Sequence, residues 1–151
     1  MDFASYITGF TDGEGCFSVS FNLRAKLKIG IEVRPSFSLT QHKRSLSILE
    51  QIQHHFACGE IRFSKKDQTY KWEVRSLIDL IKKIIPHFQK YPLLTSKNSD
   101  FEKFTRICEW MYTNKHLNPV YLEQIVLLAY TMNQSGKRKY DKAKLLKLIT
   151  R

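Results

Sequence analysis

The sequence lacks the features that would place it in a membrane, outside the cell or around a structural zinc ion. No apolar run reaches the roughly 18 residues that a membrane-spanning helix needs. Acidic Asp2, with no basic stretch ahead of an apolar core, indicates that there is no secretory signal peptide. Cys16, Cys58 and Cys108 form no Cys-x-x-Cys pair, and the five histidines form no zinc pattern. We therefore expect buried free thiols in a reducing compartment and a protein that is not secreted.

Acidic residues are also scarce. The chain has 14 Asp and Glu against 25 Lys and Arg, which gives a formal net charge of +11. This excess predicts a polyanionic partner, either nucleic acid or an acidic membrane surface. No basic amphipathic helix of the kind that binds membranes stands out, so we expect no membrane partner. With 42% hydrophobic residues in 151, the chain can bury a core, and we expect one domain over residues 1–151.

The spacing of apolar residues predicts helix, hairpin, helix, hairpin, helix and then more helices, which is an α/β (α+β) pattern. Pro35 cannot donate to a strand ladder, so it should mark a bulge or an edge position. A helix should stop before Pro86, and Asn118 should cap another. The expected helices span about 3–13, 42–57, 77–85, 97–114 and 119–132, with a short one from 141, and the strands span about 17–24, 29–40, 61–66 and 69–75.

Four strands share a face of short polar and basic side chains. A solvated sheet face is the plain alternative, but such a face usually mixes charges, whereas Glu32 and Glu73 are the acidic exceptions here. Lys and Arg can bind phosphates, Ser, Thr and Asn can read base edges, and a two-stranded ribbon fits the major groove. Duplex DNA ranks above single strands, because the aromatic residues Phe63, Tyr70 and Trp72 should face inward. The expected DNA-binding residues are Ser18, Ser20, Asn22, Arg24, Lys26, Lys28, Glu32, Arg34, Ser36, Ser38, Thr40, Arg62, Ser64, Lys66, Thr69, Lys71, Glu73 and Arg75, with Lys137, Arg138 and Lys139 of a polar, basic connector.

Two acids, Asp12 and Glu14, stand among glycines at the end of the first predicted helix. An acidic turn at a helix end is common and remains one interpretation. However, the macrodipole opposes carboxylates near a helix C-terminus, so a bound cation explains the pair better. Hard oxygen ligands suit Mg²⁺, with the Glu14 carboxylate and the Gly13 carbonyl as candidate ligands.

Small residues recur every four positions along the same helix, at Ser5, Gly9 and Gly13. This spacing leaves one helix face nearly flat. The flat face either packs against another helix within the chain or meets the same face of a second copy around a two-fold axis.

The stretch Ile7–Gly15, ITGFTDGEG, resembles the LAGLIDADG signature of homing endonucleases, and the resemblance extends in element order over essentially the whole chain. It includes Leu39-Thr40-Gln41 and Pro92–Lys97. The resemblance implies an αββαββα fold with an antiparallel DNA-binding sheet and extra C-terminal helices. Because the signature occurs once, the chain is similar to the homodimeric branch of the family. The residues expected at the helix pair are Ser5, Thr8, Gly9 and Asp12.

The resemblance also implies roles for single residues. Glu14 matches the metal-binding acid, Gly13 the neighbouring backbone ligand, and Asp12 the acid that supports the helix pair. Gln41 matches a polar residue that orders water, and Lys97 matches a basic residue near the scissile phosphate.

One position departs from some relatives, which carry a second basic residue where this chain has Ser45. Whether Lys43 or Arg44 replaces it stays open.

The implied reaction is Mg²⁺-dependent hydrolysis of both strands of a long pseudo-palindromic DNA site by a homodimer, leaving short 3′ overhangs. The resemblance further implies that Mn²⁺ substitutes and that Ca²⁺ binds without cleavage. Two alternatives stay open, an intron RNA maturase and a regulator that binds DNA without cutting it. An organelle location, mitochondrion or chloroplast, follows if the gene is organelle-encoded, and another intracellular location otherwise.

Overall fold

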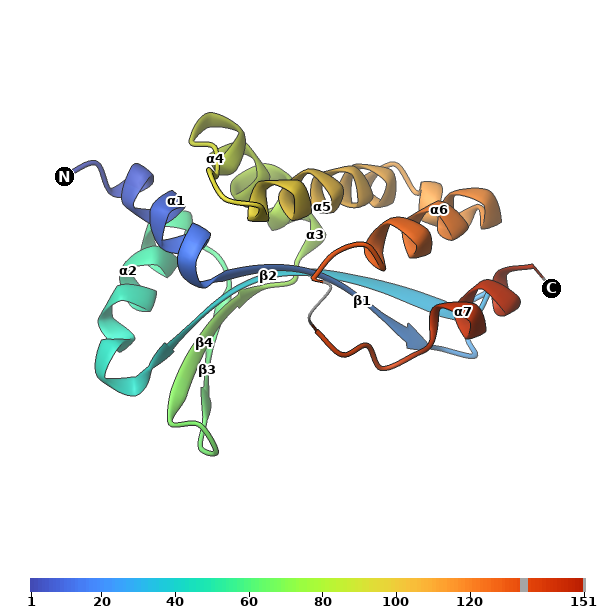
Figure 1. The fold of residues 1–151 in the computed structure, drawn as a ribbon, viewed down its shortest axis with the longest axis horizontal. Helices are drawn as coiled ribbons and strands as arrows, with labels where there is room; N and C mark the ends of the chain where they lie inside the picture. The colour runs from blue at the N-terminus through green and yellow to red at the C-terminus, as the bar shows by residue number, and fades with distance from the viewer. Residues whose placement is uncertain (134–135, 151) are drawn as a thin grey trace. The chain divides into compact units, whose positions relative to one another are not determined.

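The computed structural model describes residues 1–133 and 136–150 (Figure 1). The chain divides into two compact units. The first unit consists of Met1–Phe17 and Ser36–Asn98, and the second of Ser18–Pro35 and Ser99–Arg151. The expectation of one domain stays a prediction. Positions 134 and 135 of the expected basic connector lie outside the described residues. Within the described ranges, no helix has the length and apolar character needed to cross a membrane.

Four strands form one sheet in the order β1-β2-β4-β3. The antiparallel register of β2 with β4 runs from Phe37 opposite Val74 to His42 opposite Thr69. Pro35 lies in β2 two residues before Phe37, where this paired stretch begins, so its missing N–H lies outside the register with β4. The expected bulge or edge position stays a prediction. The strands are β1 (Gly15–Leu23), β2 (Ile31–His42), β3 (Glu60–Ser64) and β4 (Thr69–Val74).

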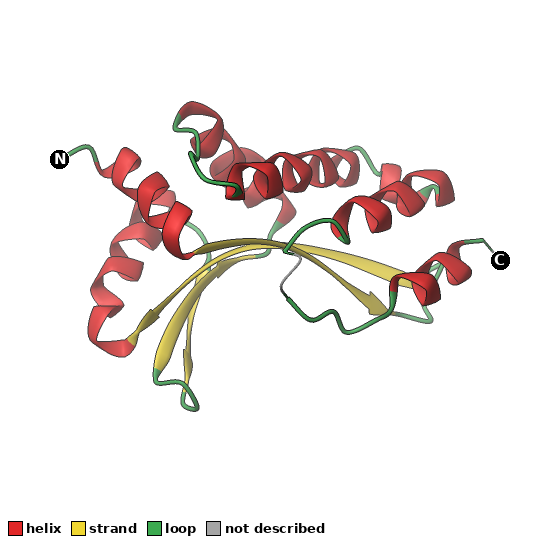
Figure 2. Cartoon of the chain, in the orientation of Figure 1, coloured by secondary structure: helices red, strands yellow, loops and turns green. Residues whose placement is uncertain are grey.

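The helices of the first unit cover one face of its strands (Figure 2). On α2, Leu49 and Ile52 are fully buried, as is Trp72 of β4, against which α2 packs. Phe88 contacts Phe37 edge-to-face, with ring centroids 5.4 Å apart. The N-terminal helices are α1 (Phe3–Glu14) and α2 (Leu46–Phe56), the latter preceded by a 3₁₀ turn, η1 (Lys43–Ser45).

The helix predicted to stop before Pro86 instead continues through it. A short helix, α3 (Leu77–Asp79), leads into a π-helical turn, η2 (Leu80–Ile84), and then into α4 (Ile85–Lys90). The π turn uses i→i+5 bonds, such as the one from the Ile85 N–H to the Leu80 carbonyl, and ends at Ile84, so Pro86 is the second residue of α4. The predicted stop was wrong because the helical segment continues without a break, through the π turn, past Pro86.

The second unit is built on helices that bury the inner face of its strand segments. Phe104, Ile107, Leu122, Ile125 and Leu145 are essentially inaccessible. As predicted, Asn118 caps a helix, and its side chain accepts a hydrogen bond from the Val120 N–H at 2.9 Å. The helices are α5 (Lys97–Tyr112), whose first two residues belong to the first unit, a 3₁₀ turn η3 (Lys115–Leu117), α6 (Pro119–Ala129) and α7 (Lys142–Ile149).

Two expectations about burial were wrong in part. Cys108 is buried, but Cys58 is half-buried and Cys16 is exposed. Phe63 is 46% exposed, although it alternates onto the same face of the β3–β4 hairpin as buried Trp72. The reason is the position of Phe63 in the hairpin. Its pair with Tyr70 lies two residues closer to the turn than the pair of Ile61 with Trp72. Alternation predicted the face correctly but not how far the core extends along it.

Candidate functional site

The two sides of α1 have different environments. Ile7, Thr8 and Thr11 are buried in the first unit. The Thr8 hydroxyl donates to the Tyr91 carbonyl at 2.8 Å and has one proton to give, so His87 Nε2, 3.2 Å away, donates to it. Thr8, which was expected at a helix pair, therefore directs its hydroxyl into its own unit.

The opposite side of α1 carries the small residues. Ser5, Gly9 and Gly13 are exposed. A Cβ atom built on Gly9 or Gly13 would meet no atom within 4 Å in the described part of the chain. Within the described residues, packing against another part of the chain therefore does not explain these two glycines. Pairing with the same face of a second copy stays a prediction.

Asp12 is held by the segment that leads into α5. Its Oδ2 accepts from the Leu94 N–H at 2.9 Å, and its Oδ1 accepts from the Thr95 N–H at 3.2 Å and the Thr95 hydroxyl at 2.6 Å. Partial burial acts to raise the pKa of this carboxyl, but these hydrogen bonds and the nearby charge of Lys97 outweigh it and lower the pKa. Asp12 is thus an engaged, ionised carboxylate that connects α1 to α5.

Glu14, two residues later, is exposed at the last position of α1. Its carboxylate enters no hydrogen bond or ion pair within residues 1–133 and 136–150. In the same described ranges, no group of three or more His, Cys, Asp or Glu side chains could hold a metal ion. A cation at this end of α1 would therefore need ligands from outside the chain in addition to Glu14 and the Gly13 carbonyl.

Lys97 lies beside the same end of α1. Its Nζ donates to the Thr11 carbonyl at 3.0 Å, within the last turn of the helix. A cation at this place also complements the negative end of the helix dipole. The structure thus brings Lys97 and Asp12 together at the end of α1.

Gln41 lies at the end of β2 and is half-buried, opposite Tyr70 of β4. Directly opposed residues share a sheet face, so Gln41 lies on the face of Leu39 and Trp72, whereas Thr40 lies on the other.

Of the two basic residues beyond Gln41, Lys43 donates from Nζ to Gln68 Oε1 at 2.9 Å, and Arg44 is exposed. Whether either one replaces the residue absent at Ser45 stays open.

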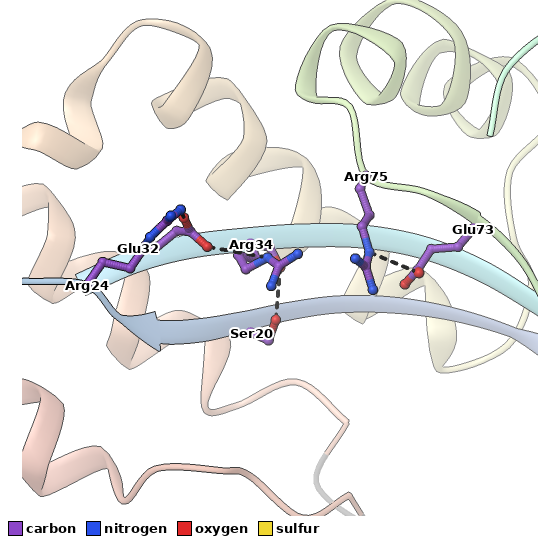
Figure 3. Close-up of polar contacts among 6 residues, drawn as sticks. All are labelled: Ser20, Arg24, Glu32, Arg34, Glu73 and Arg75. Atoms are coloured by element: carbon purple, nitrogen blue, oxygen red, sulfur yellow. Dashed lines mark hydrogen bonds and ion pairs between the residues drawn. The ribbon is translucent and has the colours of Figure 1, made fainter. Parts of the chain in front are cut away.

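In the second unit, the polar face of β1 and β2 carries a connected charge network (Figure 3). Glu32 pairs with Arg24 at 2.5 Å and with Arg34 at 3.4 Å. With its amide oxygen turned toward Arg34, Asn22 accepts from that guanidinium at 2.8 Å. The hydrogen bond from Arg24 is the largest effect on Glu32 and lowers the pKa of its carboxyl. The carboxylate therefore orients two arginines side by side.

In the first unit, arginines on the polar face are also paired with glutamates. Arg75 Nε lies 3.0 Å from Glu73 (Figure 3), and Arg62 lies 2.8 Å from Glu60. Lys71 is exposed on the same face of the hairpin as Arg62, opposite it across β3 and β4. Ser38, also expected on this face, is only 8% exposed.

The expected DNA-binding residues differ in accessibility. Apart from Ser38, they divide into an exposed and a half-buried group. The exposed group is Ser20, Arg24, Lys26, Lys28, Arg34, Arg62, Lys66, Lys71, Arg75, Lys137 and Lys139, and the half-buried group is Ser18, Asn22, Glu32, Ser36, Thr40, Ser64, Thr69, Glu73 and Arg138.

Arg138 has partners inside the second unit. Its guanidinium donates to the carbonyls of Val19 and Ala129 and lies 4.7 Å from the ring centroid of Tyr130. Burial lowers the pKa of this group. The Arg138 side chain thus joins α6 to β1. That it binds DNA stays a prediction.

Thr95 was not among the site residues expected from the sequence, but it contacts Asp12. Its hydroxyl contacts Asp12 and also accepts from the Lys97 N–H at 3.2 Å. The available signal was a threonine two residues before the first residue of a helix, which is a capping pattern.

Comparisons with known proteins agree with the fold and the signature. The family model described as LAGLIDADG endonuclease matches residues 7–108. The chain is 35% identical over 123 residues to "Probable intron-encoded endonuclease 2" of Neurospora crassa, covering 81% of this chain and 27% of that protein. It is 28% identical to "Homing endonuclease I-ApeII" of Aeropyrum pernix, covering 95% of this chain and 88% of that protein. The chain spans 24–50% of the length of three intron-encoded relatives.

Two solved structures are similar over nearly their whole length. The archaeal intron-encoded homing endonuclease I-Vdi141I, complexed with DNA, has a TM-score of 0.90 and 31% identity, covering 98% of this chain and 94% of that one. The homing endonuclease I-TnaI has a TM-score of 0.84 and 35% identity, covering 97% of this chain and 95% of that one. Since the family match covers more than half of the sequence, the chain belongs to the LAGLIDADG endonuclease family.

Proposed function

We propose that this chain is a subunit of a homing endonuclease that hydrolyses both strands of a long, pseudo-palindromic DNA site with Mg²⁺ and leaves short 3′ overhangs. The observation that carries the proposal is the contrast at the end of α1. Asp12 is fully engaged by its own chain, whereas Glu14 is exposed and without a partner in the described ranges. A free carboxylate next to a glycine carbonyl, at the helix end where Lys97 binds the Thr11 carbonyl, suits a metal-dependent reaction on phosphate.

The donor set fits Mg²⁺, which prefers a few carboxylate oxygens and keeps waters and phosphate oxygens in its shell. Glu14 and the Gly13 carbonyl would hold the ion, and water, DNA phosphate and a second subunit would complete its coordination. When bound, Mg²⁺ stabilises negative charge on the phosphoryl oxygens and leaving group. We expect Mn²⁺ to substitute and Ca²⁺ to bind without supporting cleavage.

The remaining residues of the site act on DNA and water. Lys97 would offset the charge that develops near the scissile phosphate, and Gln41 would orient water. The exposed basic residues of the sheet would bind phosphates and base edges in the major groove. Arg24 and Arg34, held together by Glu32, suit this use because a fixed guanidinium loses less freedom on binding.

A second copy is part of the proposal. The exposed stripe of Ser5, Gly9 and Gly13 would allow two α1 helices to approach closely around a two-fold axis. Each subunit would then present one Glu14, so that two metal sites act on the two strands.

The test is cleavage by the Glu14→Gln variant in Mg²⁺, on sites selected from a random DNA library with the wild-type protein. We expect cleavage to be lost while binding stays within about threefold, because the glutamine keeps the size but not the charge of the ligand. Glu50→Gln, an exposed acid on α2, is the matched control and should cleave normally. Full-rate cleavage by Glu14→Gln would refute the site. Sequence-specific binding without any cleavage by the wild type would instead identify a DNA-binding regulator.

A second candidate is an intron RNA maturase, and one observation favours it. The rings of Phe63 and Tyr70 lie 4.8 Å apart at the end of the β3–β4 hairpin, beside the exposed Lys65 and Lys66. Phe63 is exposed and Tyr70 is half-buried, and an exposed aromatic ring among lysines can stack on unpaired bases. If this function holds, Phe63→Ala should reduce intron RNA binding and splicing and leave duplex DNA cleavage unchanged.

The relatives named as intron-encoded suggest where the protein acts. We propose that it acts in the compartment that expresses its gene. This would be a mitochondrion or chloroplast for an organelle gene, and another intracellular location otherwise.

A further inference from the structure

We infer that Thr95 is a positioning residue for Lys97, and that it does so by joining Lys97 to the signature helix α1 through Asp12. The inference rests on the proposed function, in which Lys97 acts near the scissile phosphate. It assigns a role to a residue outside the signature and outside the expected site.

The first link is between Thr95 and Asp12. The Thr95 hydroxyl and its main-chain N–H both donate to Asp12 Oδ1, at 2.6 and 3.2 Å, while the Leu94 N–H donates to Oδ2 at 2.9 Å. Hydrogen bonds to an ionised acceptor are stronger than neutral ones, and the hydroxyl contact is short. Both oxygens of Asp12 are therefore used to hold the segment immediately before α5.

The second link is between Thr95 and Lys97. A hydroxyl has one proton to donate and lone pairs that accept. The Thr95 proton is given to Asp12, and its oxygen accepts from the Lys97 N–H at 3.2 Å. Thr95 thus caps the start of α5 and fixes the main chain of Lys97 at the same time.

The third link closes the connection. Lys97 Nζ donates to the Thr11 carbonyl at 3.0 Å, and Thr11 directly precedes Asp12. Lys97 is therefore held to α1 at both ends, by its ammonium group directly and by its main chain through Thr95. The three contacts form a closed ring of residues within the first unit.

This ring explains why a hydroxyl is needed at position 95. If it is removed, the Leu94 and Thr95 N–H groups can still bind Asp12, so the fold has two of its three anchors. What is lost is the link from Asp12 to the main chain of Lys97. Since small displacements of a reacting group lower the rate strongly, the loss should appear in the chemical step and not in DNA binding.

The experiment compares Thr95→Ala and Thr95→Ser in the full chain, using single-turnover cleavage in Mg²⁺ and DNA affinity in Ca²⁺. We expect Thr95→Ala to cleave at least about tenfold more slowly with affinity within about twofold. Thr95→Ser, which keeps the hydroxyl, should restore most of the rate. Thr113→Ala is the matched control, because the Thr113 hydroxyl, just past the end of α5, donates to the Glu109 and Trp110 carbonyls of that helix, and the variant should behave as wild type.

A second readout does not depend on cleavage. Acylation of Lys97 by an amine-reactive ester, mapped by mass spectrometry, should be faster in Thr95→Ala than in the wild type, with Lys71 as the exposed reference. Equal acylation of Lys97 in both proteins overturns the inference, as does a wild-type cleavage rate for Thr95→Ala. Equal losses of rate, affinity and thermal stability would also overturn it, since they indicate a purely structural role. If the wild type does not cleave at all, the proposed function fails, and the acylation result still decides whether Thr95 positions Lys97.

Discussion

Asp12 and Glu14 lie two residues apart at the end of α1, but of the two only Asp12 is bound by other parts of the described chain. Asp12 receives three hydrogen bonds from Leu94 and Thr95, and Glu14 is exposed. We therefore predict that Asp12→Asn lowers the free energy of unfolding by about 1–2 kcal/mol. The effect is no larger because solvent screens a partly exposed carboxylate. Glu14→Gln should change it by less than about 0.5 kcal/mol. Urea unfolding of both variants measures the difference.

The pH dependence gives a control for this prediction. The pKa of Asp12 is lowered in the folded state. The contribution of Asp12 to the free energy of unfolding is therefore present above the ordinary carboxyl pKa and is lost as pH falls through the lowered folded pKa. Asp12→Asn should therefore lose less stability than the wild type on acidification below about pH 4. Equal destabilisation by Asp12→Asn and Glu14→Gln would contradict the assignment of separate roles.

The second prediction concerns Gly9 and self-association. A Cβ at Gly9 meets nothing within 4 Å of the described chain, so Gly9→Ala should keep or raise subunit stability, by up to about 1 kcal/mol of helix propensity. If two α1 helices pair through this face, the added methyl group should weaken association by about tenfold or more. Sedimentation equilibrium with a parallel melting curve measures both effects. Ser47→Ala, at an exposed position of α2, should change neither, and unaltered association of Gly9→Ala would count against pairing through this stripe.

The third prediction concerns Glu32, which pairs with Arg24 and Arg34. Glu32→Gln removes a negative charge from the proposed DNA face and releases both guanidinium groups. Non-specific DNA affinity should rise by roughly threefold to tenfold, while discrimination between cognate and altered sites should fall, because phosphate attraction grows and fixed geometry is lost. Titrations at several salt concentrations, with cognate and scrambled duplexes, measure this. Glu60→Gln releases only the exposed Arg62 pair, so its effect should be smaller, and a fall in non-specific affinity for Glu32→Gln would disprove the argument.

Local patterns in the sequence predicted most of the elements. Alternation identified the strands and their inner faces, and capping chemistry placed the start of α6 at Pro119. The signature singled out Asp12 and Glu14 before their different environments were known. These features depend on neighbours in the sequence, which is why one sequence is enough to predict them.

The features that were missed depend on distant contacts. The helix continues through Pro86 by way of a π turn, and Phe63 is exposed because the core ends before the hairpin does. The bonds from Arg138 to the carbonyls of Val19 and Ala129 also join segments far apart in the sequence. Thr95 required knowing that the segment before α5 lies beside α1. Charge and spacing cannot distinguish a free cation from one already bound by main-chain carbonyls.

The fourth prediction concerns Gly59, which connects α2 to β3. Its φ of +87° is in the left-handed region that favours glycine, and an added Cβ would lie 2.9 Å from Trp72 Cε2 and 3.0 Å from the Glu73 carbonyl oxygen. Trp72 cannot move away easily, because it is fully buried and donates to the Cys58 carbonyl at 2.9 Å. Gly59→Ala should cost about 2–4 kcal/mol, from backbone strain together with overpacking. Gly30→Ala isolates the strain, since its φ is +85° but its nearest atom is 3.9 Å away, and it should cost only about 1–2 kcal/mol in thermal or urea unfolding.

The last prediction concerns His87, which is buried beneath α1. Burial is the main cause, with the nearby charge of His55 second, and together they lower the pKa of His87 from 6.5 to about 4. The folded state therefore favours the neutral ring, whose Nε2–H donates to Thr8.

Because the pKa of His87 is lower in the folded than in the unfolded state, its full contribution to stability is present above the unfolded pKa. This contribution is lost as pH falls from about 6.5 toward 4. At about 1.4 kcal/mol per pKa unit, the total loss is at most about 3.5 kcal/mol. His87→Gln keeps an N–H near the position of Nε2 but cannot titrate, so its free energy of unfolding should be lower at pH 7.5 yet fall less steeply down to pH 4.5. Urea unfolding at each pH gives the free energy of unfolding as a function of pH. Its slope is the quantity to compare, because repacking around the glutamine changes the free energy by the same amount at every pH. Identical slopes for His87→Gln and wild type would show that protonation of His87 does not limit stability in this range.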